Sequence, residues 1–294
     1  MSQRATVLAP AKINLALRVG RERPDGYHDI DTLFQAIDLS DDVEVELCGD
    51  DVTLEVEGAD LGPIEQNLAF RAASRFLEEV APGRGAAVRL LKKIPHGAGL
   101  GGGSSDAAAV LRCLTQLTGG LPAARLRGIG AELGSDVPFF LGDSPLARGR
   151  GRGELLESLP ALPVADLVLV SPPVHVATSV AYSALSASRG DRATAPEDPG
   201  PLTVRNWGDL GAVAHNDFEP ILAAEHREIG QALAALLAAG ATVASMTGSG
   251  SSCFGFFGDA PRAKAAAEGL AEELGWPCRA VRTLQAFPRP LRGI

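Results

Sequence analysis

A glycine-rich loop, Pro-His-Gly-Ala-Gly-Leu-Gly-Gly-Gly-Ser-Ser, spans residues 95–105 and directly precedes an apolar pattern with helical spacing, from Ala107 to Leu117. Five glycines allow backbone N–H groups to converge on one point, because glycine tolerates left-handed backbone conformations. The first turn of the expected helix adds unpaired N–H groups and the positive end of the helix dipole. We therefore expect residues 95–105 to bind a polyphosphate.

Two other phosphate-binding loops have related patterns. Gly97, Gly99 and Gly102 fit the G-x-G-x-x-G pattern of dinucleotide-binding folds, but no Asp or Glu occurs from Ala107 to Ala131 to hold a ribose. The Walker type needs Gly-Lys-Ser or Gly-Lys-Thr, and the chain contains neither. Any lysine that serves these phosphates must come from elsewhere in the chain. A flexible glycine turn without a ligand is the remaining alternative.

Two charged residues in other segments are candidates for chemistry. Lys12 lies in the apolar segment Ala-Pro-Ala-Lys-Ile-Asn at 9–14, where burying a cation is costly unless a partner or a phosphate compensates its charge. We expect Ser135 to cap a helix that begins at Asp136, where the helix dipole favours a carboxylate. Each also has a plain structural interpretation, Lys12 as a solvated edge residue and Asp136 as a helix-cap carboxylate.

Aromatic and polar residues that follow one turn could contact a nucleotide. The turn at 23–26 presents Tyr27, whose ring can stack on a base, and His28, which can hydrogen-bond to the edge of the base. Surface packing is the alternative for this pair. Asn67 directly precedes an expected helix, and its side chain could cap that helix.

The composition describes an ordinary soluble protein with enough apolar residues for a sizeable core. The 294 residues suggest about two domains, and the net charge of -9 argues against nucleic-acid binding as the main task. The four cysteines are scattered, without a metal or disulfide pattern, and no secretory signal is evident, so we expect a cytoplasmic protein. The uncharged stretch 232–258 is long enough to span a membrane, but its Gly-Ser content favours a buried helix, loop and strand.

Periodicity predicts a mixed α+β protein. We expect a bent strand or strand pair over 6–19, a hairpin over 42–56, a strand over 87–94 and helices over 68–80, 107–117 and 121–133. After a proline-rich stretch, strands near 165–170, 243, 254 and 279–287 alternate with helices over 221–239 and 260–274. We place a domain boundary between residues 160 and 161, giving domains 1–160 and 161–294, and expect a mobile surface loop at 188–201.

Four segments, in this order and spacing, resemble the GHMP kinase superfamily over almost the whole chain. They are residues 9–14, the glycine loop, Gly-Ser-Asp-Val-Pro at 134–138 and Thr-Gly-Ser-Gly-Ser-Ser at 247–252. Within it, Pro-Ala-Lys-Ile-Asn-Leu at 10–15 and Arg-Pro-Asp-Gly-Tyr-His at 23–28 resemble the kinases that phosphorylate the 2-hydroxyl of 4-diphosphocytidyl-2-C-methyl-D-erythritol. The resemblance implies two domains, an N-terminal one like ribosomal protein S5 domain 2 and a C-terminal ferredoxin-like α/β sandwich, with ATP and Mg²⁺ as cofactors.

The same resemblance assigns roles to individual residues. It implies a catalytic pair, Lys12 and Asp136. For Mg²⁺, the hydroxyl of Ser104 or Ser105 could supply a ligand beside water and phosphate oxygens, and we choose Ser105. The residues that would bind ATP are Asn67, Pro95, His96, Gly97, Ala98, Gly99, Leu100, Gly101, Gly102, Gly103, Ser104 and Ser105. The residues that would bind the small-molecule substrate are Asn14, Tyr27, His28, Thr178 and Tyr182. Asp106 departs from the pattern, since many relatives carry a neutral asparagine there, and it could weaken phosphate binding or offer another route to Mg²⁺.

Two alternative functions are compatible with single features. The run Arg-Gly-Arg-Gly-Arg-Gly at 148–153 is typical of RNA-binding segments, although it holds only three arginines and Glu154 follows it. Another kinase of the superfamily would phosphorylate homoserine or mevalonate, but neither acceptor has a base for Tyr27 and His28 to bind. We expect a small-molecule kinase that is a monomer or weak homodimer and binds neither nucleic acid nor membranes.

Overall fold

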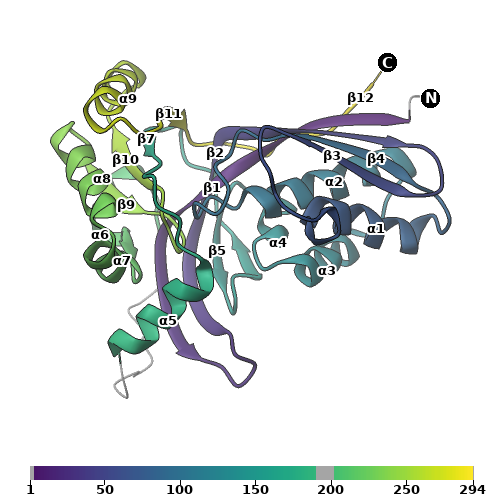
Figure 1. Ribbon diagram of the computed structural model, residues 1–294, viewed down its shortest axis with the longest axis horizontal. Helices are drawn as coiled ribbons and strands as arrows, with labels where there is room; N and C mark the ends of the chain where they lie inside the picture. The colour runs from purple at the N-terminus through teal and green to yellow at the C-terminus, as the bar shows by residue number, and fades with distance from the viewer. Residues whose placement is uncertain (1–2, 190–201, 294) are drawn as a thin grey trace.

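The computed structural model describes residues 3–189 and 202–293. Two β-sheets with helices packed against them make up most of the chain, and two long strands, β1 (Arg4–Glu22) and β2 (His28–Leu47), run from one half of the molecule to the other (Figure 1). The α+β class predicted from the sequence is confirmed. The surface loop predicted at 188–201 falls, apart from its first two residues, outside the described part of the chain.

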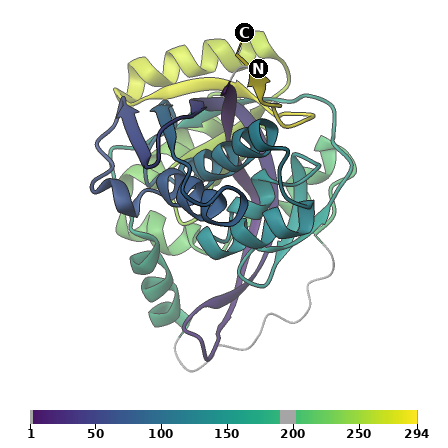
Figure 2. The ribbon, with the colours of Figure 1, turned by 90° about the vertical axis from the view of Figure 1, so that its right-hand side faces the viewer.

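The first sheet is mostly antiparallel. Its central order is β12-β1-β2-β4-β3, and β5 pairs with β2, β6 with β5 and β8 with β1. These strands are β3 (Val52–Glu57), β4 (Ala86–Leu91), β5 (Leu146–Arg150), β6 (Leu155–Ser158), β8 (His215–Asn216) and β12 (Leu291–Arg292). Because β8 and β12 come from the last third of the chain, that part returns to the first sheet, and the two termini lie at the same end of the molecule (Figures 1 and 2).

The hairpin predicted over 42–56 is wrong. Strand β4 lies between β2 and β3, antiparallel to the first and parallel to the second, and the crossover from β3 to β4 contains a 3-10 turn, η1 (Ile64–Gln66), and helix α1 (Leu68–Val80). In β4, Ala86, Val88 and Leu90 are all buried, whereas β3 exposes every second residue. The more apolar strand therefore occupies the inner position, which the local sequence alone does not reveal.

An irregularity in β1 decides which side chains face the helices. The pairing of β1 with β2 shifts register between Pro10 and Ala11. Before it, alternate residues from Ala5 to Ala9 pack in the core beneath the helices, whereas beyond it Ala11 and Ile13 pack against the second sheet. Bulges of this kind re-aim side chains near functional sites. Lys12 lies between Ala11 and Ile13 on β1, so after the shift it lies on the face of the strand opposite to these two residues.

Helices α1, α2 (Gly102–Thr118), α3 (Ala123–Leu133) and α4 (Val137–Phe140) cover one face of the first sheet (Figure 2). The helices predicted at 68–80 and 121–133 match α1 and α3 to within two residues. The helix predicted at 107–117 was placed too late, because α2 already begins at Gly102, within the segment predicted as a loop. Large apolar side chains such as Phe76, Leu111 and Phe139 are fully buried in this core. This packing fixes the glycine loop between the end of β4 and the start of α2.

The second sheet is antiparallel with the order β11-β7-β10-β9. Its strands are β7 (Asp166–Val170), β9 (Val243–Met246), β10 (Cys253–Phe257) and β11 (Cys278–Arg282). Its helical segments are α5 (Thr178–Arg189), η3 (Trp207–Asp209), α6 (Leu210–Val213), α7 (Glu219–Glu225), α8 (Arg227–Ala238) and α9 (Ala260–Leu274). Numbered along the chain, the strand order is 4-1-3-2, and the β-α-β-β-α-β succession agrees with the predicted ferredoxin-like arrangement.

The helix predicted over 221–239 is two helices, α7 and α8, which meet at His226, a residue with extended backbone. The uncharged stretch 232–258 forms the end of α8, strands β9 and β10 and the loop between those strands, as predicted. No helix in the described residues has the length and apolar character needed to cross a bilayer.

Candidate active site

One large cleft of about 1200 Å³ brings together residues from both halves of the molecule. It is lined by every residue assigned a role from the sequence except Ser105. Cavities that hold one small ligand usually measure roughly 300–1,000 Å³. This cleft therefore has room for two small molecules side by side.

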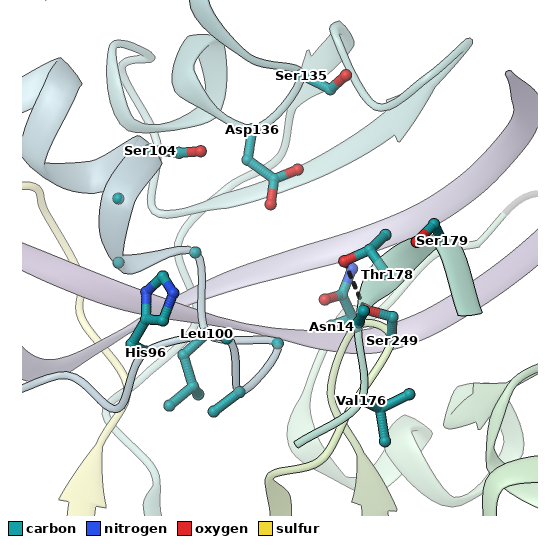
Figure 3. A pocket seen from close by; sticks show the side chains of 18 of the residues that line it. Asn14, His96, Leu100, Ser104, Ser135, Asp136, Val176, Thr178, Ser179 and Ser249 are labelled. Atoms are coloured by element: carbon teal, nitrogen blue, oxygen red, sulfur yellow. Dashed lines mark hydrogen bonds between the residues drawn. The ribbon is translucent and has the colours of Figure 1, made fainter. Parts of the chain in front are cut away.

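Lys12 and Asp136, distant in sequence, meet in this cleft. The Lys12 Nζ lies 3.6 Å from the Asp136 Oδ2, and the lysine side chain is 5% exposed. Figure 3 shows the Asp136 carboxylate directed into the cleft, with Ser104 on the same side and Asn14, Thr178 and Ser249 across from it. The buried Lys12 ammonium and the Asp136 carboxylate thus lie close together next to the glycine loop.

The Lys12 ammonium is held by more than this carboxylate. It donates to the Asn14 Oδ1 at 2.6 Å and lies 5.6 Å from the centroid of the Phe34 ring. Burial lowers the pKa of Lys12, and the neighbouring Asp136 opposes this effect. Asp136 and Asn14 therefore offset only part of the cost of burying the positive charge of Lys12. An anion bound in the cleft would stabilise this charge further.

Asn14 belongs to a buried polar network that sequence reasoning only partly found. Its Nδ2 donates to Thr32 Oγ1 at 2.7 Å, and its backbone N–H donates to Thr247 Oγ1 at 3.0 Å. Thr247 in turn donates to the Gly99 carbonyl at 3.2 Å. The Gly-Ser segment at 247–252 was singled out as a motif, and the structure shows that its first residue joins β1 to the glycine loop.

The glycine loop approaches other backbone so closely that side chains would not fit. A Cβ at Gly99 would lie 2.1 Å from the Thr247 carbonyl oxygen, and Gly99 has a φ of +77°. Gly101 precedes α2 in the left-handed conformation, and a Cβ there would lie 3.0 Å from the Lys12 Cγ. The first-turn N–H groups of α2 have no partner within the helix. They are thus placed to bind an anion beside Lys12.

The surroundings of Asp136 differ from the sequence-based expectation in one respect. Helix α4 has only four residues, Asp136 itself occupies its N-cap position, and no side chain caps it, so Ser135 is not the cap. A helix dipole of one turn is weak. The partner that matters for this carboxylate is Lys12.

At the other end of the cleft, aromatic side chains gather around the β1–β2 turn. The rings of His28 and Tyr182 stack with centroids 4.9 Å apart, and Tyr182 also packs edge-on against Phe218. Tyr27 is 52% exposed, and the Arg152 guanidinium lies 4.8 Å from its ring centroid. Tyr182 thus contacts His28 and Phe218, whereas Tyr27 contacts Arg152. Arg152 belongs to the Arg-Gly run at 148–153, which from the sequence suggested only RNA binding. In the structure it lines the cleft.

Two of the predicted contacts also have structural roles. The Asn67 side chain accepts from the Ala69 N–H at 2.9 Å and so caps α1, while Asn67 also lines the cleft. Thr178 Oγ1 lies 3.1 Å from Ser249 Oγ, so the start of α5 contacts the Gly-Ser loop. Both the ligand-binding and the capping interpretation of Asn67 are therefore compatible with its position.

The predicted magnesium residue Ser105 lies away from the cleft. Its hydroxyl is buried without a hydrogen-bond partner, and it borders a small void lined by Pro10, Ala108 and Phe140. Ser104, one position earlier on α2, lines the cleft instead. Within residues 3–189 and 202–293, no three His, Cys, Asp or Glu side chains form a metal-binding group. A hydroxyl supplemented by water and phosphate oxygens still suits Mg²⁺, which usually takes few protein ligands beside a nucleotide.

A second lysine of the cleft, Lys92, was not identified from the sequence. It lines the cleft and forms buried ion pairs with Asp41 and Asp106. Burial raises the pKa of Asp106 to about 7, against the opposing effect of Lys92. The one signal for Lys92 in the sequence is its place directly after a strand that leads into the loop.

Comparison with known proteins gives consistent matches over the whole chain. Residues 67–143 match the GHMP kinases N terminal domain, and residues 201–275 match the GHMP kinases C terminal model. A protein of Geobacter sulfurreducens named 4-diphosphocytidyl-2-C-methyl-D-erythritol kinase is 41% identical over 287 residues, covering 96% of this chain and 100% of that protein. One of the same name from Pelobacter propionicus is 40% identical over 285 residues, covering 95% of this chain and 99% of that protein.

Solved structures show the same likeness. A crystal structure of 4-(cytidine 5'-diphospho)-2C-methyl-D-erythritol kinase superposes with a TM-score of 0.78 at 37% identity, covering 95% of this chain and 98% of that one. A homoserine kinase from Cytophaga hutchinsonii superposes with a TM-score of 0.70 at 20% identity, covering 99% of this chain and 98% of that one. The second match concerns the fold alone.

Proposed function

This chain belongs to the 4-diphosphocytidyl-2-C-methyl-D-erythritol kinases, a family of GHMP kinases, and we propose that Lys12 and Asp136 are the catalytic pair of its ATP-dependent phosphoryl transfer. The acceptor is the 2-hydroxyl of 4-diphosphocytidyl-2-C-methyl-D-erythritol, and the products are the 2-phosphate and ADP. The observation that carries the proposal is the 3.6 Å approach of Lys12 Nζ to Asp136 Oδ2 beside the start of α2. It supports a single reaction centre between the two ends of the cleft.

The glycine loop is the proposed ATP site. Backbone N–H groups from residues 95–104 and the start of α2 would surround the triphosphate, because they converge at the positive end of that helix. Asn67 lies at the neighbouring wall, where its free amide hydrogens could meet the adenine while its oxygen caps α1. With ATP bound in this way, the γ-phosphate would lie next to Lys12.

The cytidine diphosphate end of the acceptor would occupy the opposite end. Tyr27 offers an exposed ring face for stacking on cytosine, and His28 offers ring nitrogens for the edge of the base. Tyr182 stacks with His28, Thr178 begins the same helix α5, and all three line the cleft. Asn14, which also lines the cleft, accepts from the Lys12 ammonium. The alcohol is then directed toward the catalytic pair.

In the proposed reaction the 2-hydroxyl oxygen attacks the γ-phosphorus, the bond from that phosphorus to the β–γ bridging oxygen breaks, and ADP leaves. The hydroxyl proton passes to the Asp136 carboxylate, which faces the cleft. The Lys12 ammonium, fixed by Asn14, stabilises the charge that develops on the transferred phosphoryl group. Because both groups are held before substrate binds, little reorganisation is needed.

Ser104 is the residue proposed to hold Mg²⁺, together with water and phosphate oxygens. The metal ion would neutralise charge on the β- and γ-phosphates.

We propose further that residues 1–160 and 161–294 act as two domains, since β6 ends at Ser158 and β7 starts at Asp166 in the other sheet. The protein would act in the cytoplasm as a monomer or weak homodimer, without nucleic acid or membrane partners.

An ADP-release assay with a panel of alcohols tests this function. We expect turnover with 4-diphosphocytidyl-2-C-methyl-D-erythritol, and at least about a hundredfold lower kcat/KM with homoserine or mevalonate, because neither reaches the Tyr27 end of the cleft. Equal or better turnover of mevalonate would reject the proposed acceptor. Salt-sensitive submicromolar binding to RNA would instead support the Arg-Gly run at 148–153 as an RNA site.

A further inference from the structure

A buried cation lies between two carboxylates directly beneath the glycine loop. The Lys92 Nζ donates to Asp41 Oδ2 and to Asp106 Oδ2, the latter at 2.5 Å. The side chains of Lys92, Asp41 and Asp106 are 4%, 0% and 2% exposed. None of the three takes part in the phosphoryl transfer proposed above. Burying three charges is costly, so we looked for what this cluster does beside the loop.

The cluster ties together the elements that shape the loop. Asp41 belongs to β2, and its Oδ1 accepts from the backbone N–H groups of Lys93 at 2.5 Å and Ile94 at 2.8 Å. These two residues lead from β4 into the loop. Asp106 belongs to the first turns of α2 on the far side of the loop. One ammonium group therefore connects the entry to the loop with its exit.

The cluster also controls the charge beside the proposed phosphate site. A Cβ on Gly102 would lie 3.5 Å from the Lys92 Nζ, so the ammonium lies against the start of α2. Asp106 Oδ1 is buried and has no hydrogen-bond partner in the described structure. Both Lys92 and Asp106 line the cleft. Without Lys92, this carboxylate would repel a triphosphate bound at the same helix end.

We propose that Lys92 is a positioning residue for ATP, which bridges Asp41 and Asp106 to hold the glycine loop in shape and to cancel the negative charge of Asp106 next to the triphosphate. The inference rests on the proposed ATP site. It also explains Asp106, which from the sequence alone could either weaken phosphate binding or provide a contact to Mg²⁺. In the structure Asp106 binds the Lys92 ammonium, and the positive charge of Lys92 offsets the negative charge of Asp106.

The first test is Lys92→Met, with the Kd of ATP measured by calorimetry. We expect the Kd to rise by about tenfold or more, because an unpaired carboxylate then faces the phosphates, while the Kd of CDP is unchanged. Lys93→Met is the matched control: Lys93 is adjacent, half-exposed and paired with Asp42 at 2.8 Å on the surface. Its ATP affinity should equal that of the wild type. Equal ATP affinity in Lys92→Met and Lys93→Met would overturn the inference.

A second pair of variants separates charge from shape and keeps the test informative if Lys92→Met does not fold. Asp106→Asn keeps an oxygen for Lys92 but removes the negative charge, so we expect ATP to bind about threefold more tightly. In Lys92→Met/Asp106→Asn, ATP affinity should recover most of the loss seen in Lys92→Met. A steady-state KM for ATP should change in parallel, with the KM for the acceptor unchanged.

The outcomes distinguish this inference from the function on which it rests. If the wild type does not bind ATP at all, the proposed function fails. If the wild type binds ATP but Asp106→Asn binds it no more tightly and the double variant shows no recovery, only the charge-cancelling role of Lys92 is rejected.

Discussion

Lys12 shows how a single residue acquires its chemistry from its surroundings. Its side chain is almost fully buried on a strand, between the Asn14 amide, the Phe34 ring and the Asp136 carboxylate. A cation in such a place is stabilised further by any anion that enters the cleft. The residue can therefore favour a phosphoryl group over water without moving.

The lowered pKa of Lys12 gives a pH prediction. Since burial lowers this pKa below its ordinary value of 10.5, Lys12 loses its proton at lower pH than an exposed lysine. The proposed mechanism uses the charged form, so kcat/KM should fall as pH rises through the lowered pKa. Arginine stays protonated at all accessible pH, so the fall should be absent in Lys12→Arg, whatever its absolute rate.

The measurement is a profile of kcat/KM from pH 6 to pH 10.5, with circular dichroism at each pH to confirm that the protein remains folded. A wild-type profile that stays level to the alkaline limit would contradict the assigned charge state. A fall of the same shape in Lys12→Arg would assign it to another group.

At the scale of elements, helix ends carry both structure and function. Helix α1 begins after Asn67 and helix α9 after Asp259, and in each the side chain accepts from a first-turn N–H. These caps, with clear apolar periodicity, explain why both helices could be predicted to within a residue or two. The β2–β3 hairpin could not, because the partner of a strand depends on segments far away in the chain.

Asn67 allows the capping and nucleotide-binding roles to be separated. Asn67→Ala loses the cap and should lower the free energy of unfolding by about 1 kcal/mol. Asn67→Asp keeps a capping oxygen but lacks amide hydrogens, so its stability should match the wild type while the KM for ATP rises several-fold. Urea unfolding and steady-state kinetics measure the two effects. If Asn67→Asp leaves the KM for ATP unchanged, Asn67 only caps the helix.

At the scale of the whole molecule, the active site is assembled by the packing of the two halves. Thr247 bonds to both Asn14 and Gly99, and Asn216 donates to the Met246 and Gly248 carbonyls, so the Gly-Ser loop is held against β1 and the glycine loop. Periodicity and spacing predict the individual elements but not these contacts. That Lys12 would meet Asp136 could be predicted only from the family resemblance.

The residues that sequence reasoning missed show what limits it. Choosing Ser105 over Ser104 is a difference of one helical position, or about 100°, and the phase of α2 depends on its packing. Lys92 and Arg152 each lie among other basic residues, Lys93 and Arg150, which are exposed or lie outside the cleft. Only tertiary structure distinguishes the member of such a pair that lines the cleft from its solvated neighbour.

The most direct test of the account is single-turnover kinetics of Asp136→Asn and Lys12→Met with ATP and 4-diphosphocytidyl-2-C-methyl-D-erythritol. The two groups meet at 3.6 Å, and the account predicts that each substitution slows phosphoryl transfer by about a hundredfold to a thousandfold while ATP and CDP still bind. Near-normal transfer in both variants would contradict the claim that this pair is the reaction centre.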